Sequence, residues 1–324
     1  MKKFLMALAA AGALAPALAQ TVMPIKWDMP SGYGPNTFQV QNLQAFADDV
    51  DKASAGKLKI TVHANASLFK ANEIKRAVQS GQTAAGEFII SGAANENPLF
   101  GLDSIPFLAT SYAESRRLND ASRPALEKLL ASQNLKLLYA VPWPPQSLYS
   151  MQPVTSLADL KGTRMRAYNP ATSRIAELVG ASPVTVQLAE LPAALATGAV
   201  HNFLTSSASG MDSKLYEHVR NFYGVAAWLP RNAVVVNQKS FDGLDKATQA
   251  AVLKAAADAE VRGWRISEQK DGEYLRELAG KGMRIDAAAE GLKRELKVVG
   301  ERMTADWLAS AGADGKAVID AYRK

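Results

Sequence analysis

The chain has 324 residues, of which 48% are hydrophobic and 21% are charged, and this composition predicts a packed globular protein large enough for two domains. It contains no cysteine, which excludes disulfides, thiolate metal sites and cysteine nucleophiles. The formal net charge of +6 is mild, and because the sequence has no dense basic stripe with interleaved aromatic residues, we expect no nucleic-acid partner.

The first 19 residues have the pattern of an export signal. Lys2 and Lys3 form a charged start, and residues 4–14 form an apolar core that is too short to be a good membrane span. Ala17-Leu18-Ala19 is a small-x-small cleavage site. We therefore expect cleavage after Ala19 and a mature protein in the periplasm; the alternative is an uncleaved membrane anchor.

Residues 20–141 alternate short apolar strands with amphipathic helices. Strands are expected at 25–28, 58–63, 88–90 and 135–141, and helices at 37–54, 72–80 and 111–132. This alternation predicts parallel sheets covered by helices on both faces. Prolines at 142, 144 and 145 cannot lie inside a sheet, so we expect the first domain to end near Val141. The chain is expected to cross between the two domains after Val141 and a second time at 228–230, before an apolar strand at 233–236.

Residues 157–207 read as a β-α-β-α unit. The expected strands are 163–167 and 183–186, and the expected helices are 171–179 and 190–197. Arg166 lies at the C-terminal end of the first of these strands, which is where ligands bind in open α/β sheets. Its guanidinium offers a rigid fork that matches a carboxylate, so Arg166 is the strongest candidate ligand residue, the alternative being a surface or interdomain ion pair.

A long helix is expected at 245–279. Asp245 is a good N-cap, good helix formers dominate the next 34 residues, and proline is absent. At 1.5 Å per residue such a helix would span roughly 50 Å, which is longer than one small domain is wide. The alternative is two helices broken near Gly263 or Gly272. Further helices are expected at 290–310 and 315–322.

Three hydroxyl residues follow the next expected strand end. Thr205, Ser206 and Ser207 can donate and accept hydrogen bonds and could bind the second oxygen of a carboxylate or a keto or hydroxyl group beside it. The alternative is that they cap a helix near 213–217.

Aromatic residues lie at several expected strand ends and crossings. They are predicted to form a flat apolar pocket, the alternative being packing at a domain edge; they are Trp27, Tyr33, Trp143, Tyr168 and Trp228. Ser91 and Asn232 are further candidate ligand contacts, and a hinge role is the alternative for Asn232.

Enzyme motifs are lacking. His63, His201 and His218 have no metal-ligand spacing, and the sequence carries no nucleophile elbow, phosphate loop or dinucleotide fingerprint. We therefore expect no catalytic residues, no metal and no cofactor.

Five short motifs occur in a specific order. They are Gln79-Ser80-Gly81-Gln82, Ile105-Pro106-Phe107-Leu108, Asp159-Leu160-Lys161-Gly162 followed by Arg166, Gly180-Ala181-Ser182-Pro183, and Leu195 to Val200. Through the order and spacing of these motifs, most of the segment 25–280 resembles the solute-binding proteins of tripartite ATP-independent periplasmic (TRAP) transporters, the DctP-type family. The sequence departs from the family pattern at His201, where aspartate is usual, and at Thr205, where asparagine is usual. The second departure implies a modified carboxylate site.

The resemblance implies a two-domain α/β periplasmic binding protein fold, with mixed sheets covered by helices and one long helix that crosses both domains. The implied divisions are 20–141 plus 229–262 for domain I, 142–228 plus 263–310 for domain II, with the helix 245–279 spanning both, and 311–324 as a C-terminal helix.

The function implied is capture of an organic monocarboxylate between the domains, with Arg166 as the carboxylate clamp, followed by docking on the membrane subunits of a transporter. Tryptophan near the expected cleft and hydroxyls in place of asparagine favour an aromatic or bulky apolar 2-oxo or 2-hydroxy acid. The alternatives are a small aliphatic 2-oxo acid or a sugar acid, and an enzyme or a sensor subunit on the same scaffold. We expect a monomer.

Overall fold

The computed structural model describes residues 23–288 and 290–324. The expected export signal and the cleavage after Ala19 lie outside these residues. Among the residues that are described, no helix is long and apolar enough to cross a membrane.

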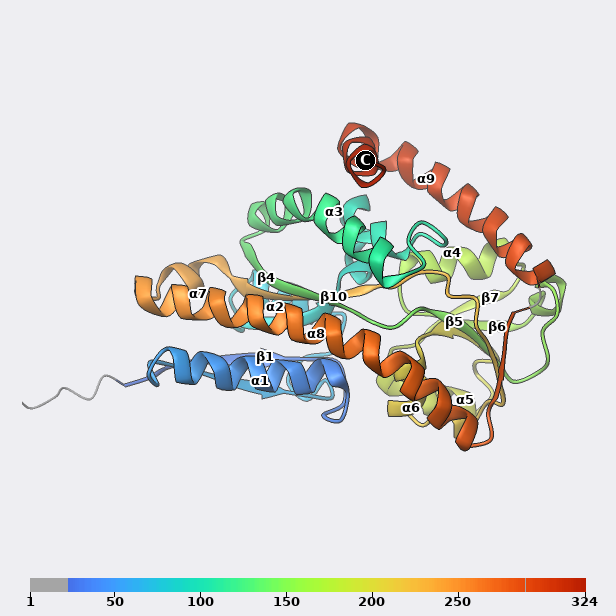
Figure 1. Cartoon of the computed structure of the whole chain (residues 1–324), viewed down its shortest axis with the longest axis horizontal. Coiled ribbons are helices and arrows are strands. Elements are labelled where there is room, and N and C mark those ends of the chain that lie inside the picture. Colours follow the sequence, from blue (N-terminus) through green and yellow to red (C-terminus); the bar gives the residue numbers. More distant parts are fainter. Residues whose placement is uncertain (1–22, 289) are drawn as a thin grey trace, which may run out of the picture.

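The chain alternates strands and helices along most of its length (Figure 1). The strands are β1 (Ile25–Pro30), β2 (Leu58–His63), β3 (Ala85–Ile89), β4 (Leu135–Pro142), β5 (Ser147–Ser150), β6 (Arg164–Ala167), β7 (Ser182–Thr185), β8 (Asn202–Thr205), β9 (Asn221–Tyr223), β10 (Arg231–Asn237) and β11 (Arg284–Asp286). The helices are α1 (Phe38–Ala53), α2 (Ile74–Gln79), α3 (Tyr112–Ser132), α4 (Pro170–Leu178), α5 (Leu191–Ala196), α6 (Ser207–Asp212), α7 (Gln238–Asp242), α8 (Lys246–Gly280) and α9 (Glu290–Tyr322).

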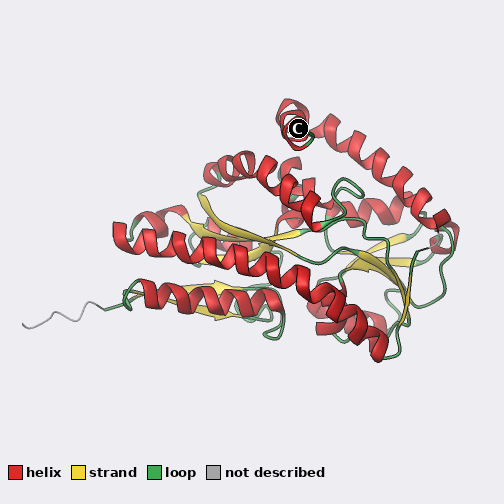
Figure 2. Ribbon diagram, viewed as in Figure 1, coloured by secondary structure: helices red, strands yellow, loops and turns green. Residues whose placement is uncertain are grey.

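The strands form three groups. β1 and β2 pair in parallel, β3-β10-β4 is antiparallel, and the third sheet has the order β11-β9-β5-β8-β6-β7. In this third sheet β6 runs parallel to β7 and β8, whereas β5 runs antiparallel to β8 and β9. Helices lie on both sides of the strands (Figure 2). The mixed α/β class is therefore confirmed.

Purely parallel sheets, which the alternation of strands and helices predicted, are wrong for two of the three groups. The reason is that β10 returns from the second crossing and inserts between β3 and β4 in the opposite direction. β5, β9 and β11 were not predicted, because strands of three or four residues are too short to show a period of two.

α8 is one continuous helix, so the alternative of a break near Gly263 or Gly272 is wrong. It begins where the Asp245 side chain accepts a hydrogen bond from the Thr248 backbone N–H at 2.9 Å. Gly263 serves close packing instead of a break, since a Cβ at this position would lie 2.5 Å from the Val141 side chain on β4. Figure 1 shows α8 running beside α1 at one end and beside α6 at the other.

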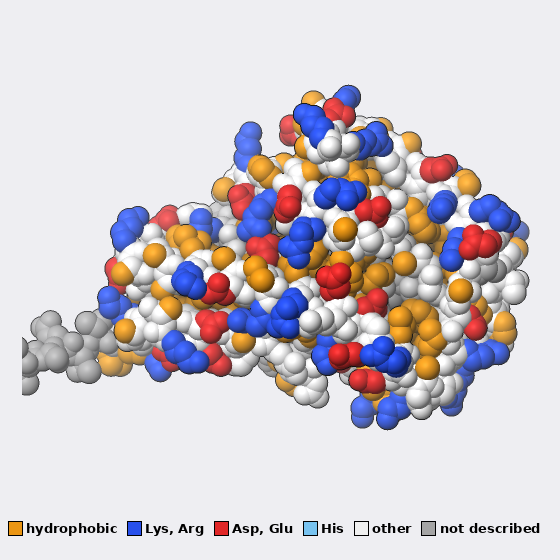
Figure 3. Space-filling model, in the orientation of Figure 1, with side chains coloured by type: hydrophobic (Ala, Val, Ile, Leu, Met, Phe, Trp, Pro, Cys, Tyr) orange, Lys and Arg blue, Asp and Glu red, His pale blue; other side chains and the backbone are white. Residues whose placement is uncertain are grey.

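The core is built where the predicted helix faces meet the sheets. Val40, Leu43, Phe46, Ala47 and Val50 on α1 are all buried, as their spacing of three and four predicted, and the last four belong to one core cluster. α9 bends at Gly312, where φ is +58°, so its two halves correspond to the two predicted C-terminal helices. Figure 3 shows Lys and Arg side chains interspersed with Asp and Glu on the face in view. The division into domains at 142, 229 and 263 stays a prediction.

Candidate functional site

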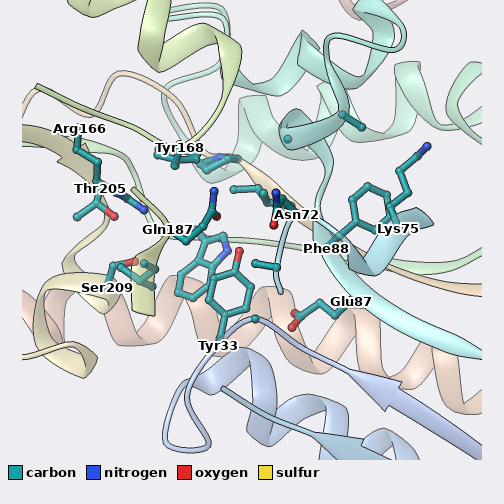
Figure 4. A pocket seen from close by; sticks show the side chains of 18 of the residues that line it. Tyr33, Asn72, Lys75, Glu87, Phe88, Arg166, Tyr168, Gln187, Thr205 and Ser209 are labelled. Atoms are coloured by element: carbon teal, nitrogen blue, oxygen red, sulfur yellow. The ribbon is translucent and has the colours of Figure 1, made fainter. Parts of the chain in front are cut away.

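A cavity of about 220 Å³ opens between the C-terminal ends of β3 and β6 (Figure 4). Its wall combines side chains from far apart in the sequence, namely Gly32, Tyr33, Ala71, Asn72, Lys75, Arg76, Glu87, Phe88, Ile89, Gly92, Ala93, Glu96, Trp143, Gln146, Arg166, Tyr168, Gln187, Leu188, Thr205, Ser209 and Pro230. Five of the residues predicted from the sequence are in this wall: Arg166, Thr205, Tyr168, Trp143 and Tyr33.

Arg166 lies on β6 and is 4% exposed. Its Nε donates to the Val186 carbonyl oxygen at 2.8 Å, and its guanidinium carbon lies 5.0 Å from the centre of the Tyr168 ring. No carboxylate of the described chain forms an ion pair with it, and burial lowers the pKa of its guanidinium to about 10. At neutral pH the group is still charged, so the cavity holds an uncompensated buried cation.

Thr205 ends β8, a strand that runs parallel to β6 in the same sheet. Because parallel strands end at the same edge, the Thr205 hydroxyl and the Arg166 guanidinium both line one side of the cavity (Figure 4). Gln187 and Ser209, which the sequence analysis did not single out, lie on the same side. A cation flanked by hydroxyl and amide groups can bind a carboxylate through both of its oxygens.

Three aromatic rings form another part of the wall. The Tyr33 and Trp143 ring centres are 4.9 Å apart at a tilt of 57°, and Trp143 in turn packs edge-on against Phe38 at 5.3 Å. The Tyr168 hydroxyl donates to Gln146 Oε1 at 3.4 Å, and burial raises the pKa of this hydroxyl. These rings give the cavity rigid apolar surfaces suited to a flat ligand.

Asn232 is 1% exposed and is not part of the cavity wall. Its Oδ1 accepts hydrogen bonds from Trp143 Nε1 at 2.9 Å and from the Tyr33 hydroxyl at 3.3 Å, while its Nδ2 donates to Glu87 Oε1 at 2.9 Å. It thereby holds three residues of the wall in position.

Glu87 is a wall residue that the sequence analysis did not name. It lies on β3, is 1% exposed, and accepts from the Ser31 hydroxyl at 2.6 Å as well as from Asn232. Burial raises the pKa of its carboxyl to about 7, although the hydrogen bonds from Ser31 and Asn232 lower this pKa. The signal was present in the sequence, because a lone acid inside the apolar run 84–90 has to serve some polar purpose when the strand is buried.

Lys75 lies at another edge of the cavity, away from Arg166 in Figure 4. Its side chain is 7% exposed, and its Nζ lies 2.5 Å from Glu96 Oε2 and 5.2 Å from the centre of the Phe100 ring. Glu96 compensates this charge, and Arg76, the third cation of the wall, is exposed to solvent. Arg166 is therefore the buried cation of the wall that has no protein anion among the described residues.

Two of the predicted hydroxyl residues hold the structure together outside the cavity wall. Ser206 caps α6, with its Oγ accepting from the Ser209 backbone N–H at 3.1 Å, and the Ser207 hydroxyl donates to Asp271 Oδ1 on α8 at 2.6 Å. The helix capped is thus α6 at Ser207–Asp212 and not a helix at 213–217, where only a short 3₁₀ turn occurs.

Three further predicted residues also lie outside the wall. Ser91 accepts from Asn169 Nδ2 at 2.8 Å and so connects the end of β3 to the start of α4. Trp27 is 3% exposed in the cluster around α1, and Trp228 is 1% exposed in the cluster beneath α4. Within residues 23–288 and 290–324, no group of three or more histidine and acidic side chains is arranged to hold a metal ion.

Comparison with known proteins decides the family. Residues 31–307 match the family of bacterial extracellular solute-binding proteins, family 7, named DctP. The chain belongs to the DctP-type solute-binding proteins. A solute-binding protein of Verminephrobacter eiseniae is 30% identical over 286 residues, which cover 84% of this chain and 81% of the relative.

Two solved structures are closer. An extracytoplasmic solute receptor of Bordetella pertussis that binds pyroglutamic acid has 53% identity and a TM-score of 0.91, and the match covers 92% of this chain and 99% of that one. A TRAP solute-binding protein from a marine metagenome, in complex with co-purified pyroglutamate, has 44% identity and a TM-score of 0.91 over 93% of this chain and 99% of that one.

Membership in this family confirms three expectations. The protein is a carboxylate-binding subunit that works with the membrane components of a TRAP transporter, it belongs to a periplasmic family, and it is a receptor and not an enzyme. The ligand, the site residues and the oligomeric state require separate arguments.

Proposed function

We propose that this protein captures pyroglutamate, or a small cyclic acid very similar to it, in the periplasm. The observation that carries the proposal is Arg166, a buried guanidinium with no carboxylate partner among the described residues, at the wall of a cavity. A buried charge without a partner is costly, so the site is incomplete until a ligand anion arrives. Two receptors with 53% and 44% identity to this chain bind pyroglutamate, which supplies a carboxylate on a compact ring.

The carboxylate and the ring of the ligand each have a place in this proposal. Arg166 binds the carboxylate with both free nitrogens of its fork, and the Thr205 hydroxyl binds a carboxylate oxygen from the neighbouring strand end. The five-membered ring packs between Tyr33, Trp143 and Tyr168. The remaining predicted residues are proposed to support this wall from behind; they are Trp27, Ser91, Ser206, Ser207, Trp228 and Asn232.

The aromatic acid favoured by the sequence is a competing ligand. The aromatic wall that prompted it fits a flat lactam ring equally well, and the cavity volume of about 220 Å³ is below the roughly 300–1,000 Å³ typical of sites for drug-sized ligands. A small aliphatic 2-oxo acid and a sugar acid are the other competitors.

A ligand panel tests the proposal. Purified protein is titrated by calorimetry with L-pyroglutamate, phenylpyruvate, pyruvate and glucuronate, and the ligand retained through purification is identified by mass spectrometry after unfolding. We expect tight binding of pyroglutamate and at least a hundredfold weaker binding of the other three acids. Tight binding of phenylpyruvate or glucuronate without binding of pyroglutamate contradicts the proposal.

Ligand capture is proposed to close the cleft between the two predicted domains, because the cavity wall draws on β3 from one and on β6 and β8 from the other. We further propose that the mature chain works as a monomer. Small-angle scattering with and without pyroglutamate should give one monomeric mass and a smaller radius of gyration for the bound form. A dimeric mass, or an unchanged radius, contradicts this pair of proposals.

A further inference from the structure

The Glu87 carboxyl group is surrounded by donors whose orientation the structure determines. Ser31 Oγ accepts a hydrogen bond from the Tyr33 backbone N–H at 3.2 Å, so the hydroxyl proton of Ser31 is left to point at Glu87 Oε2, 2.6 Å away. This arrangement makes Ser31 a donor to Glu87.

The same reasoning applies to Asn232 on the other carboxyl oxygen. The Trp143 indole N–H can only donate, and it meets Asn232 Oδ1 at 2.9 Å. The amide nitrogen of Asn232 therefore faces Glu87 Oε1, at 2.9 Å. Both neighbours of Glu87 thus present hydrogens to it, and a carboxylate accepting from both is the form that this arrangement favours.

The Glu87 carboxylate can accept further hydrogen bonds. Two carboxylate oxygens offer about four lone-pair positions, of which Ser31 and Asn232 occupy two. No lysine, arginine or histidine of the described chain forms an ion pair with Glu87, and it lines the same cavity as Arg166 (Figure 4). The cavity therefore combines a cation without a protein anion and an acceptor without a protein cation.

We propose that Glu87 accepts a hydrogen bond from a ring N–H of the ligand and thereby selects cyclic amides that carry a carboxylate over oxo acids and cyclic esters, which have no donor at this position. This inference rests on the proposed function, since it assumes that Arg166 holds the carboxylate of the same ligand. A ligand that turns a carbonyl or ether oxygen toward Glu87 brings lone pairs against lone pairs at a buried carboxylate, and such a ligand is disfavoured.

Two ligands that differ in a single atom group test this selection. L-Pyroglutamate carries a ring N–H, and (S)-5-oxotetrahydrofuran-2-carboxylate has an oxygen in its place. We expect the wild-type protein to bind the lactam about tenfold to a hundredfold more tightly than the lactone, as measured by calorimetry at about pH 8, above the pKa of about 7 of the Glu87 carboxyl. In Glu87→Gln the amide can rotate to donate to the lactone oxygen, so we expect the preference to fall below about threefold.

Glu127→Gln is the matched control, because Glu127 lies on the exposed side of α3 and pairs with Arg123. It should retain the wild-type preference. If the wild-type protein binds both ligands equally, or if Glu87→Gln keeps the full preference, the role of Glu87 is wrong while the proposed function stands. If the wild-type protein binds neither ligand, the proposed function itself fails, and the inference fails with it.

Proton exchange gives a second measurement that needs no variant. A ligand N–H stabilises the charged carboxylate, so binding at pH 6 should release protons, which calorimetry in two buffers of different ionisation enthalpy detects. Tyr33 and Tyr139 interact electrostatically with Glu87, and burial raises the pKa of both hydroxyls above their ordinary value. Arg166 lines the same cavity, and its pKa is about 10. Lys75, Arg76 and Glu96 line the cavity rim. Proton uptake, or no exchange, overturns the assignment.

Discussion

Two buried arginines of this protein have opposite surroundings. Arg231 on β10 is 2% exposed. Asp103 Oδ2 accepts hydrogen bonds from the Arg231 Nε at 3.2 Å and from the Arg231 backbone N–H at 3.0 Å. Asn119 and Ser122 accept hydrogen bonds from the other two guanidinium nitrogens. Arg166 on β6 is 4% exposed, but a backbone carbonyl is its one hydrogen-bond acceptor among the described residues. The chain thus supplies an anion for one buried arginine and none, among the described residues, for the other.

This difference separates a structural charge from a binding charge. Arg231 and Asp103 compensate one another when the chain folds, so their removal acts on stability. Arg166 carries its desolvation cost in the ligand-free protein, so under the proposed function its removal acts on affinity. The four predictions that follow test this separation, from the largest expected effect to the smallest.

Replacing Asp103 by alanine should have the largest effect, on stability. The change leaves Arg231 buried and uncompensated, and we expect the free energy of unfolding to fall by about 3–5 kcal/mol in urea titrations of the ligand-free protein. Glu177→Ala removes an exposed ion pair with Arg174 and should cost no more than about 1 kcal/mol. Equal losses in the two variants would contradict the comparison.

Replacing Arg166 by alanine should weaken pyroglutamate binding by roughly 2–5 kcal/mol in calorimetry. The free energy of unfolding of the ligand-free variant should not fall by the amount seen for Asp103→Ala, because Arg166 has no carboxylate partner to lose. Arg166→Met, which keeps most of the side-chain volume without the charge, should leave the stability unchanged or raise it. Unchanged affinity in Arg166→Ala would remove this residue from the site.

Glu87 should make the stability of the ligand-free protein depend on pH. Its pKa is about 7 in the folded state against an ordinary 4.5, so between these values the folded state holds a proton that the unfolded state has lost. The free energy of unfolding should therefore fall as pH rises through this range, by up to about 3 kcal/mol.

Glu87→Gln removes this contribution. Its stability relative to the wild-type protein should rise between pH 4.5 and pH 7, as measured by urea unfolding at a series of pH values. Asp212, whose pKa is also raised to about 7, is present in both proteins and drops out of the difference. Parallel pH profiles would contradict the prediction.

The smallest expected effects separate two adjacent hydroxyl residues. Thr205→Val should weaken pyroglutamate binding by about 1 kcal/mol with little change in stability, because its hydroxyl lines the cavity. Ser206→Ala should instead lower the free energy of unfolding by about 1 kcal/mol with little change in affinity, because Ser206 caps α6. Calorimetry and urea unfolding of both variants check the pair, and interchanged effects would contradict the assignments.

Much of the fold could be predicted because local patterns dominate the long elements. The spacing of apolar residues in α1 and the Asp245 cap with its proline-free run in α8 carry their own signals, and both helices occur as expected. The short strands β5, β9 and β11 could not be predicted in this way. Each exists because a neighbouring strand pairs with it, which is a property of the assembled sheet.

The candidate site divides in the same manner. Arg166 and Thr205 could be placed at the cavity because strand ends in an α/β sheet are recognisable from sequence. Ser206 and Thr205 are neighbours of similar chemistry, and only the start of α6 assigns one to a cap and the other to the cavity. Glu87 and Asn232 lie 145 positions apart, so their hydrogen bond has no local signature.

The sequence by itself determined the alternation of strands and helices, the long helix and the arginine at a strand end, because each of these depends on residues that are close in the chain. It also determined the family, because the motifs occur in a specific order along the chain. The tertiary structure decided which buried charges are paired. It joined Arg231 to Asp103 and left Arg166 and Glu87 facing a common cavity. The physical reason is that charge compensation inside a protein depends on distance in space, and segments remote in the chain decide which buried charges meet a partner.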